Sequence, residues 1–402
     1  MKLFWMEVKR QTTSLTFTIY TLLVMAFVLL NMGPMLARNV AALPTSTNSY
    51  DDITAIDFQT RKTNGVGQLR YDYQHNAYVT YPLGFAKTVT LPKADQARVR
   101  RLLTQANQAE TQATLVKALG QVDRMIGGQS AYGSQNIQGF ASRPMTKAEA
   151  RQDHNLILKK DRISGTFARL FADYAGIVMG ILPTVVVIAY CYADRRSRAT
   201  TSLQSKMTST WRLVGSRYLA SLVTLLMPIF LMGIVLTIQI ALHYQGYQID
   251  YLAFFKMTGL WLLPTVMVSS AVGFLSDALF GNFLGFVVQI GWWLSTMMIG
   301  ARQVAGNYGW LLIPRHNSLH NVAYYEAHLP ELLFNRLTYA ALAIGFICLA
   351  VVLLNLQRGG KFYAINFETL GRVRTQSQRV QHYFDRAWVW PAHAGCFYDD
   401  AK

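Results

Sequence analysis

The stretch "YLASLVTLLMPIFLMGIVLTIQIALH" (Tyr218–His243) carries no Asp, Glu, Lys or Arg from end to end. A helix needs about 20 predominantly apolar residues to cross the hydrocarbon core of a bilayer, so this stretch is long enough to span a membrane. Further apolar stretches lie at Leu15–Leu36, Phe167–Tyr192, Tyr251–Leu275, Phe283–Gly300 and Leu332–Leu356. The sequence therefore predicts an all-α polytopic membrane protein with six transmembrane helices, the first over residues 15–37 and the others within residues 166–356.

The composition supports this class and argues against two others. Apolar residues make up 52% of the chain and charged residues only 15%, which excludes an ordinary soluble enzyme. The net charge of +17 could indicate a nucleic-acid-binding protein, but such a protein gathers its cations on one soluble face. Here many Lys and Arg residues flank apolar stretches, so the expected partner is the lipid bilayer and no nucleic acid is expected.

The N-terminal residues 1–14 predict an amphipathic helix at the membrane interface, because "MKLFWMEVKRQTTS" combines apolar and basic residues. A cleavable signal peptide is the alternative interpretation, since basic residues here precede an apolar run. The run is longer than a typical signal-peptide core, which favours a retained first transmembrane helix.

Residues 38–165 are polar and predict a folded domain inserted between the first two transmembrane helices. Alternation in "QLRYDYQHNAYVTY" (residues 68–81) predicts a β-hairpin. Residues Lys93–Ile126 predict a helix that ends at Gly127-Gly128. Thr146 and Glu149 match a capping box, and we expect the helix that they begin to continue into the second transmembrane helix. The domain is therefore predicted to be mixed α and β.

The distribution of Lys and Arg predicts the orientation. These residues concentrate before the first span, in residues 193–217 and in residues 357–402, whereas Tyr244–Asp250 has none. Because cytoplasmic loops carry an excess of Lys and Arg, we expect both termini in the cytoplasm, residues 357–402 as a cytoplasmic tail, and residues 38–165 on the opposite side. The inserted domain has no cysteine, and this mildly favours a bacterial plasma membrane over an animal cell surface.

The only substantial cytoplasmic loop expected between spans is residues 193–217. Within it, Leu203, Met207, Trp211 and Val214 recur at helical spacing, which predicts an amphipathic helix that could dock on a soluble partner. The alternative is that the cations only fix the topology and that the apolar face only contacts lipid.

The order of these parts resembles the permease subunits of ABC-2 type exporters. In "DRRSRATTSLQSKMTSTWRLVGSRYLAS", the positions that match the segment after the second span of that family are Asp194, Arg195, Arg196, Thr200, Thr201, Leu203, Ser209, Trp211 and Arg217. Ala199 stands near the place of a usual glycine. The resemblance implies a coupling helix that contacts an ATP-binding subunit through Arg195, Arg196, Thr200, Leu203, Met207 and Trp211. It also implies a dimer with a second copy or a similar permease.

A second resemblance lies in "LLIPRHNSLHNVAYYEAHLPELLFNRLTYAALAIG", where Asn335, Arg336 and Tyr339 match the outer re-entrant region and the start of the last span in these permeases. The chain has no Walker A loop, because Gly360-Lys361 is followed by Phe362 and lacks the first glycine. We therefore expect a transport subunit that is not itself an enzyme, with no cofactor of its own, and with ATP and Mg²⁺ on the partner subunit.

Two other functions stay open as alternatives. An ion-driven secondary transporter usually places a carboxylate or histidine near the membrane centre, and here only the neutral Gln239 and Gln289 are predicted to lie there. Those glutamines would either line a translocation path or form hydrogen bonds between helices. A membrane-anchored surface-binding or signalling protein is the second alternative. His316 and His320 lack the carboxylate of a zinc signature, so no metal site is expected.

Overall fold

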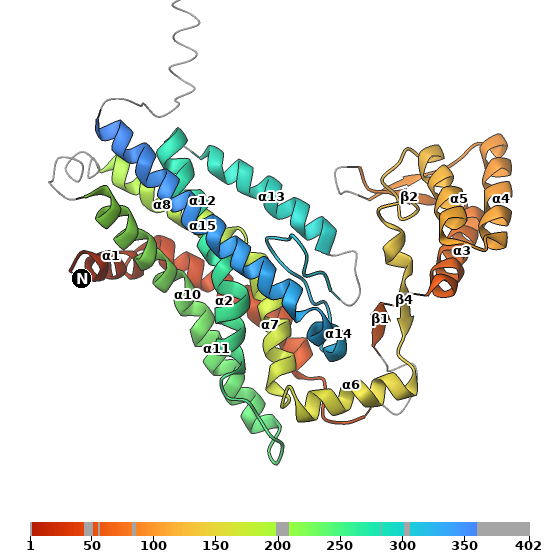
Figure 1. Ribbon diagram of the computed structural model, residues 1–402, viewed down its shortest axis with the longest axis horizontal. Helices are drawn as coiled ribbons and strands as arrows, with labels where there is room; N and C mark the ends of the chain where they lie inside the picture. The colour runs from red at the N-terminus through yellow and green to blue at the C-terminus, as the bar shows by residue number, and fades with distance from the viewer. Residues whose placement is uncertain are drawn as a thin grey trace, which may run out of the picture.

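The computed structural model describes residues 2–43, 51–54, 57–82, 86–197, 209–281, 283–300 and 306–359. Long helices form a bundle, and a smaller unit lies to one side of it (Figure 1). The bundle contains α1 (Lys2–Thr12), α2 (Leu15–Leu36), α7 (Ser164–Met179), α8 (Leu182–Arg196), α10 (Thr210–His243), α11 (Ala253–Met257), the π-helix η4 (Thr258–Leu262), α12 (Leu263–Phe280), α13 (Leu284–Gly300), α14 (Val322–Ala327) and α15 (Leu329–Arg358).

In the part of the chain that the structure describes, five helical segments are long and apolar enough to cross a membrane, as expected for a polytopic membrane protein. They are Leu15–Leu36, Ser164–Arg196, Thr210–His243, Ala253–Phe280 and Leu329–Arg358. The sixth predicted span is α13, an apolar helix of 17 residues. At 1.5 Å per residue it is about 25 Å long, less than the ~30 Å of a hydrocarbon core. The number of six spans therefore stays a prediction.

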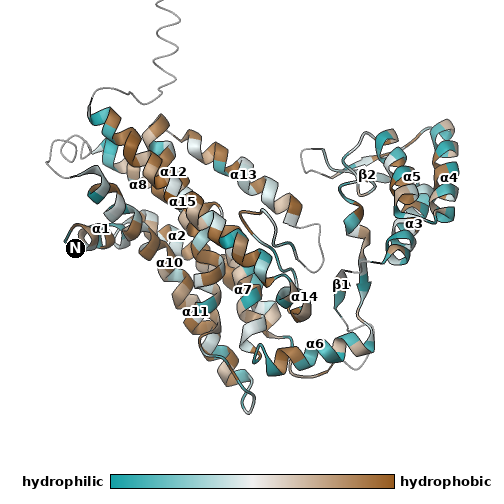
Figure 2. Ribbon diagram, viewed as in Figure 1, coloured by the Kyte–Doolittle hydropathy of each residue, from teal (hydrophilic) through white to brown (hydrophobic). Residues whose placement is uncertain are grey.

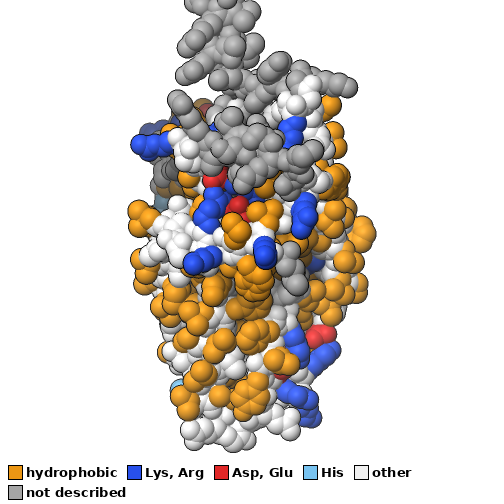
Figure 3. Space-filling model, turned by 90° about the vertical axis from the view of Figure 1, so that its left-hand side faces the viewer, with side chains coloured by type: hydrophobic (Ala, Val, Ile, Leu, Met, Phe, Trp, Pro, Cys, Tyr) orange, Lys and Arg blue, Asp and Glu red, His pale blue; other side chains and the backbone are white. Residues whose placement is uncertain are grey.

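The surface of the bundle has the character of a lipid-facing surface. Hydrophobic residues dominate its helices, whereas the smaller unit is largely hydrophilic (Figure 2). Apolar side chains cover much of the face drawn in Figure 3, and Lys and Arg gather toward its upper part. One exposed apolar stripe runs along α10 and consists of Leu219, Val223, Met227, Leu231, Ile234, Ile238 and Leu242. Such a stripe fits a helix that faces lipid or a second membrane helix.

The helix α12 lies at the centre of the bundle, packed against α8 and α15, while α2 packs against α7 and α10. Gly273 allows the close approach of α12 to α8, because a Cβ there would lie 2.8 Å from Val187 Cγ1. Pro183 lies in the first turn of α8, just after the break from α7, and Pro264 lies in the first turn of α12, directly after the π-helix. Proline lacks the N–H of a helical hydrogen bond, which explains why the helices are interrupted there.

The smaller unit has its own hydrophobic core, which includes Val66, Leu69, Val99, Leu119 and Val122. It contains α3 (Phe58–His75), α4 (Lys93–Gln108), α5 (Gln112–Met125), the 3₁₀ helix η3 (Ile137–Phe140) and the antiparallel pair β2 (Tyr78–Thr80) and β3 (Lys87–Val89). A second antiparallel pair, β1 (Asp52–Thr54) and β4 (Ser142–Pro144), and the helix α6 (Lys147–Lys159) connect it to the bundle. The predicted mixed domain is thus mainly helical, with two short β-ribbons.

Three local predictions for residues 38–165 were wrong in part. Gln68–His75 belongs to α3 and not to a hairpin, because Val66, Leu69 and Tyr73 form one helical face on the core. Ala109–Thr111 divides Lys93–Ile126 into α4 and α5, although the expected stop is confirmed by positive φ at Gly127 and Gly128. The Thr146 capping box is confirmed, but α6 ends at Lys159. Positive φ at Arg162 and Ile163 separates it from α7.

The capping box of α6 gives a testable pH dependence. The hydrogen bonds of Glu149 with Arg143, at 2.7 and 2.8 Å, and with Thr146 lower the pKa of Glu149 from 4.5 to about 2. A lowered pKa means that this stabilisation is complete above pH 4.5 and is lost as the pH falls toward 2. We expect Glu149→Gln to lower the thermal unfolding midpoint at pH 6 and to differ less from the wild type at pH 3. Glu110→Gln, an exposed position, is the control and should show no such convergence.

Candidate functional site

The helix α1 is attached to the bundle through its polar face. Glu7 and Gln11 are buried, whereas Trp5 and Met6 are 62% and 66% exposed. This arrangement is the reverse of that in a soluble protein, and it places the apolar face of α1 where lipid would be in a membrane. The predicted interfacial helix therefore exists as a helix, and its buried polar residues explain what holds it in place.

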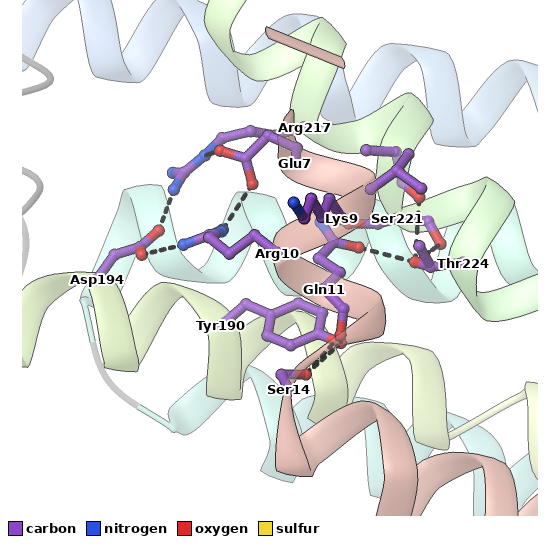
Figure 4. Close-up of polar contacts among 12 residues, drawn as sticks. Glu7, Lys9, Arg10, Gln11, Ser14, Tyr190, Asp194, Arg217, Ser221 and Thr224 are labelled. Atoms are coloured by element: carbon purple, nitrogen blue, oxygen red, sulfur yellow. Dashed lines mark hydrogen bonds and ion pairs between the residues drawn. The ribbon is translucent and has the colours of Figure 1, made fainter. Parts of the chain in front are cut away.

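Four charged side chains from α1, α8 and α10 meet at this contact, and we call them the four-charge cluster: Glu7, Arg10, Asp194 and Arg217 (Figure 4). Arg10 Nη2 lies 2.7 Å from Glu7 Oε2, and Arg217 Nε lies 3.2 Å from Glu7 Oε1. Both arginines also form ion pairs with Asp194. Each charge thus has two partners of opposite sign, and the cluster is neutral as a whole.

The burial of the cluster makes its charge balance important. The side chains of Glu7, Asp194 and Arg217 are only 9%, 6% and 14% exposed, whereas Arg10 reaches solvent at 43%. Removing charges from water is costly unless each has a close partner and hydrogen bonds. The loss of one member would therefore leave an uncompensated charge among apolar helices.

Neutral polar contacts extend the attachment of α1 deeper into the bundle. Gln11 Nε2 donates to Ser221 Oγ at 3.1 Å, and its Oε1 accepts from Thr224 Oγ1 at 2.7 Å. Ser14 Oγ lies 3.3 Å from the hydroxyl of Tyr190 on α8. Through these contacts and the four-charge cluster, α1, the end of α8 and the beginning of α10 are fastened together.

A cavity of about 200 Å³ adjoins the four-charge cluster, between α8, α10, α12 and α15. Its lining includes Cys191, Arg217, Phe274 and Leu354. Arg195 and Asp277 also line it and form an ion pair with one another. This end of the bundle therefore combines a cavity of mixed charged and apolar lining with a buried ionic cluster.

The structure places three of the six predicted coupling residues. Arg195 and Arg196 lie in the last turn of α8, where Arg195 pairs with Asp277 and Arg196 is exposed. Trp211 lies in the first turn of α10 and is 53% exposed. Thr200, Leu203 and Met207 lie outside the described residues. Along the chain, the described ends of the segment lie three residues after Asp194, at Ser197, and eight residues before Arg217, at Ser209.

The two glutamines predicted to lie centrally do not come together. Gln289 on α13 is fully buried, and its Nε2 donates to the carbonyl of Gly180 at 2.5 Å and to Ser269 Oγ at 3.4 Å. These contacts fit the interpretation as a hydrogen bond between helices. Gln239 is exposed on α10, four residues before the end of that helix, and its role in a translocation path stays a prediction.

The three residues assigned to the outer re-entrant region do meet. Arg336 is buried and donates hydrogen bonds to the carbonyls of Trp261, Leu311 and Leu312 at 3.0 to 3.3 Å, and to Thr265 Oγ1 at 2.7 Å. Asn335 donates to the carbonyls of Gly309 and Leu311. The Tyr339 ring lies 5.2 Å from the Arg336 guanidinium. Together they hold the chain before α14 against the π-helix.

The segment 306–321 enters the bundle between α13 and α14. Its Ile313 is buried against Gly176 and Gly180, the latter halfway along Ser164–Arg196. Arg315 forms an ion pair with the buried Asp173 of α7 at 2.5 Å. His316 contacts Tyr308, and His320 contacts Asp153 at 2.8 Å. Within the described ranges, no group of three His, Cys, Asp or Glu residues could hold a metal ion.

Sequence reasoning missed the partners of two residues that it named. Asp194 and Arg217 were selected by resemblance alone, and nothing in the pattern indicated that Glu7 and Arg10 would meet them from a distant segment. The available signal was a carboxylate in an otherwise apolar and basic N-terminal helix, which needs a cation if it is buried.

In comparisons with known proteins, no family, no curated protein and no solved structure matches this chain.

Proposed function

We propose that this chain is the membrane-spanning subunit of an ATP-driven exporter of the ABC-2 type. The observation that carries the proposal is the four-charge cluster, because it fastens α1 to α8 and α10, the two helices that precede and follow the segment 197–209. A partner that pushed on this segment would move α1, α8 and α10 together. In this proposal the ATP-binding subunit docks there, holds ATP and Mg²⁺, and supplies the motion.

The rest of the architecture fits the proposed role. The five apolar segments are long enough to form a membrane-spanning body, and the cations near Arg195 and Trp211 favour a cytoplasmic docking end under the positive-inside rule. By this orientation the smaller unit would face outward, and the membrane would be the plasma membrane of a bacterium. The permease would work as a dimer with itself or with a similar permease.

An ion-driven carrier is less well supported by the geometry. Such a carrier needs an ionisable group that can change partner during transport. The buried carboxylate of Asp173 is instead held by two hydrogen bonds from Arg315, at 2.5 and 3.2 Å. Its position beneath the segment 306–321 fits a structural ion pair.

The test of the proposal is co-purification from native membranes. The N-terminus is tagged, the protein is solubilised gently, and mass spectrometry identifies the bound proteins. We expect an ABC-type ATP-binding subunit with the wild type and at least a tenfold smaller amount with the triple variant Leu203→Asp, Met207→Asp and Trp211→Asp, because carboxylates on an apolar docking face must be desolvated without a partner.

The matched control carries three Asp substitutions at exposed apolar residues of the opposite end: Tyr251, Leu252 and Trp310. It should retain the ATP-binding subunit in wild-type amount. Absence of any ATPase from the wild-type preparation in several mild detergents would refute the exporter proposal. Equal recovery of the ATP-binding subunit with both triple variants would refute the claim that it docks on the segment 197–209.

A further inference from the structure

The smaller unit carries a cationic groove on a surface that the proposed export function does not use. The helices α4 and α5 are joined by Ala109–Thr111 and pack side by side as a hairpin (Figure 1). Between them lies a groove of about 550 Å³, which we call the α4–α5 groove. Its lining has charged and amide side chains: Arg98, Arg101, Gln105, Gln121 and Arg124.

The positions of the arginines follow from helical spacing. Arg98, Arg101 and Gln105 lie on one face of α4 at intervals of three and four residues. Gln121 and Arg124 lie three residues apart on α5. Because α4 and α5 run antiparallel across a short connection, Arg98 comes opposite Arg124, and Arg101 comes opposite Gln121. Three guanidinium groups therefore converge on one groove.

The acidic residues of the two helices do little to neutralise this charge. Asp95 forms an exposed ion pair with Arg98 at 3.5 Å, and a pair of that kind is weak. Asp123, next to Arg124 in sequence, points away and accepts hydrogen bonds from Ser130 N at 2.8 Å and Ser130 Oγ at 2.6 Å. None of the residues that line the groove is acidic. Like charges gathered in this way repel each other and favour an anionic ligand.

The chemistry of the lining distinguishes among anions. All three cations are arginines, whose planar guanidinium groups bind phosphate oxygens in bidentate fashion more readily than lysine does. The two glutamines add amide groups that can donate to and accept from hydroxyl or phosphate oxygens. An open site lined by separate arginines of both helices suits an extended chain with a charge at each repeat.

We propose that the α4–α5 groove binds a phosphate-bearing polyanion, such as a phosphodiester polymer, through Arg98, Arg101 and Arg124. This inference does not depend on the exporter proposal, since the groove belongs to the unit with its own core. Each arginine contributes an exposed ion pair to the contact. Binding should therefore weaken with increasing salt.

The experiment uses the full-length protein in nanodiscs of zwitterionic lipid and fluorescently labelled inorganic polyphosphate as the probe. We expect binding at about 50 mM salt and a loss of roughly thirtyfold in affinity for Arg98→Ala, Arg101→Ala and Arg124→Ala together, at about threefold for each exposed ion pair. The control triple variant removes three exposed cations elsewhere: Arg70→Ala, Arg100→Ala and Lys147→Ala. It should lose less than threefold.

The comparison ligands are polyglutamate of equal charge and nanodiscs that contain anionic phospholipid. Wild-type binding of polyphosphate but not of polyglutamate supports recognition of phosphate. Equal weakening by both triple variants would show that net charge acts without the groove, and this would overturn the proposal. The proposal would also be overturned if the protein bound no polyphosphate, or if it bound polyglutamate as tightly as polyphosphate. It would likewise be overturned if the groove variant lost binding to anionic phospholipid but kept its binding to polyphosphate.

Discussion

Arg217→Met should lower the free energy of unfolding by about 3–5 kcal/mol, because it removes one partner of a buried ionic cluster and leaves the opposite charges without full compensation. Both arginines of the four-charge cluster pair with Glu7 and Asp194, but Arg217 is the more buried of the two, at 14% exposed against 43% for Arg10. Without it, Arg10 alone would face two buried carboxylates. The change is measured by unfolding the protein in mixed micelles with a denaturing detergent.

Two further variants separate charge balance from lost packing. Arg212→Met removes an exposed arginine from the same helix and should change stability by less than about 0.5 kcal/mol. The double variant Arg217→Met with Glu7→Gln leaves Arg10 paired with Asp194, so part of the lost stability should return. If the loss in free energy of unfolding in the double variant exceeds the summed losses of the two single variants, balanced charge is not what stabilises the contact.

The predictions that succeeded depended on local composition and short motifs, and those that failed depended on long-range contact. Long apolar stretches predicted the membrane-spanning segments because hydrophobicity alone requires them. The α3 region was misjudged because the short alternation in "QLRYDYQH" (residues 68–75) also fits a helix whose Leu69 and Tyr73 face a core. The periodicity of one short segment does not show which distant residues pack against it in that core.

The candidate site shows the same limit. The sequence selected Asp194 and Arg217, but whether they were solvated or buried depended on α1. The glutamines looked equivalent along the chain, yet Gln289 is fully buried and Gln239 is exposed. Helical phase relative to neighbours decides this difference, and a single apolar stretch with no polar face leaves that phase unspecified.

Arg336→Leu should lower the free energy of unfolding by about 3 kcal/mol, because it removes the donors for several buried carbonyls. Those carbonyls belong to Trp261 of the π-helix and to Leu311 and Leu312 of the segment 306–321. The expected consequence is release of this segment from the bundle. Faster limited proteolysis between Gly306 and Asn321, measured in detergent, would report it.

Comparing Arg336→Leu with Arg336→Lys tests whether the hydrogen-bonding geometry of the guanidinium or its positive charge holds the segment 306–321 in place. The Arg336 hydrogen bonds go to neutral oxygen atoms of Trp261, Thr265 and the segment 306–321, so the planar fork and its several donors hold the segment. Arg336→Lys keeps the charge with fewer donors and leaves a poorly compensated buried cation, so we expect it to be at least as destabilising as Arg336→Leu. Lys256→Met, which removes a cation that is 62% exposed, should leave the proteolysis rate unchanged. Wild-type stability in Arg336→Lys would mean that positive charge, and not the geometry of the guanidinium, holds the segment in place.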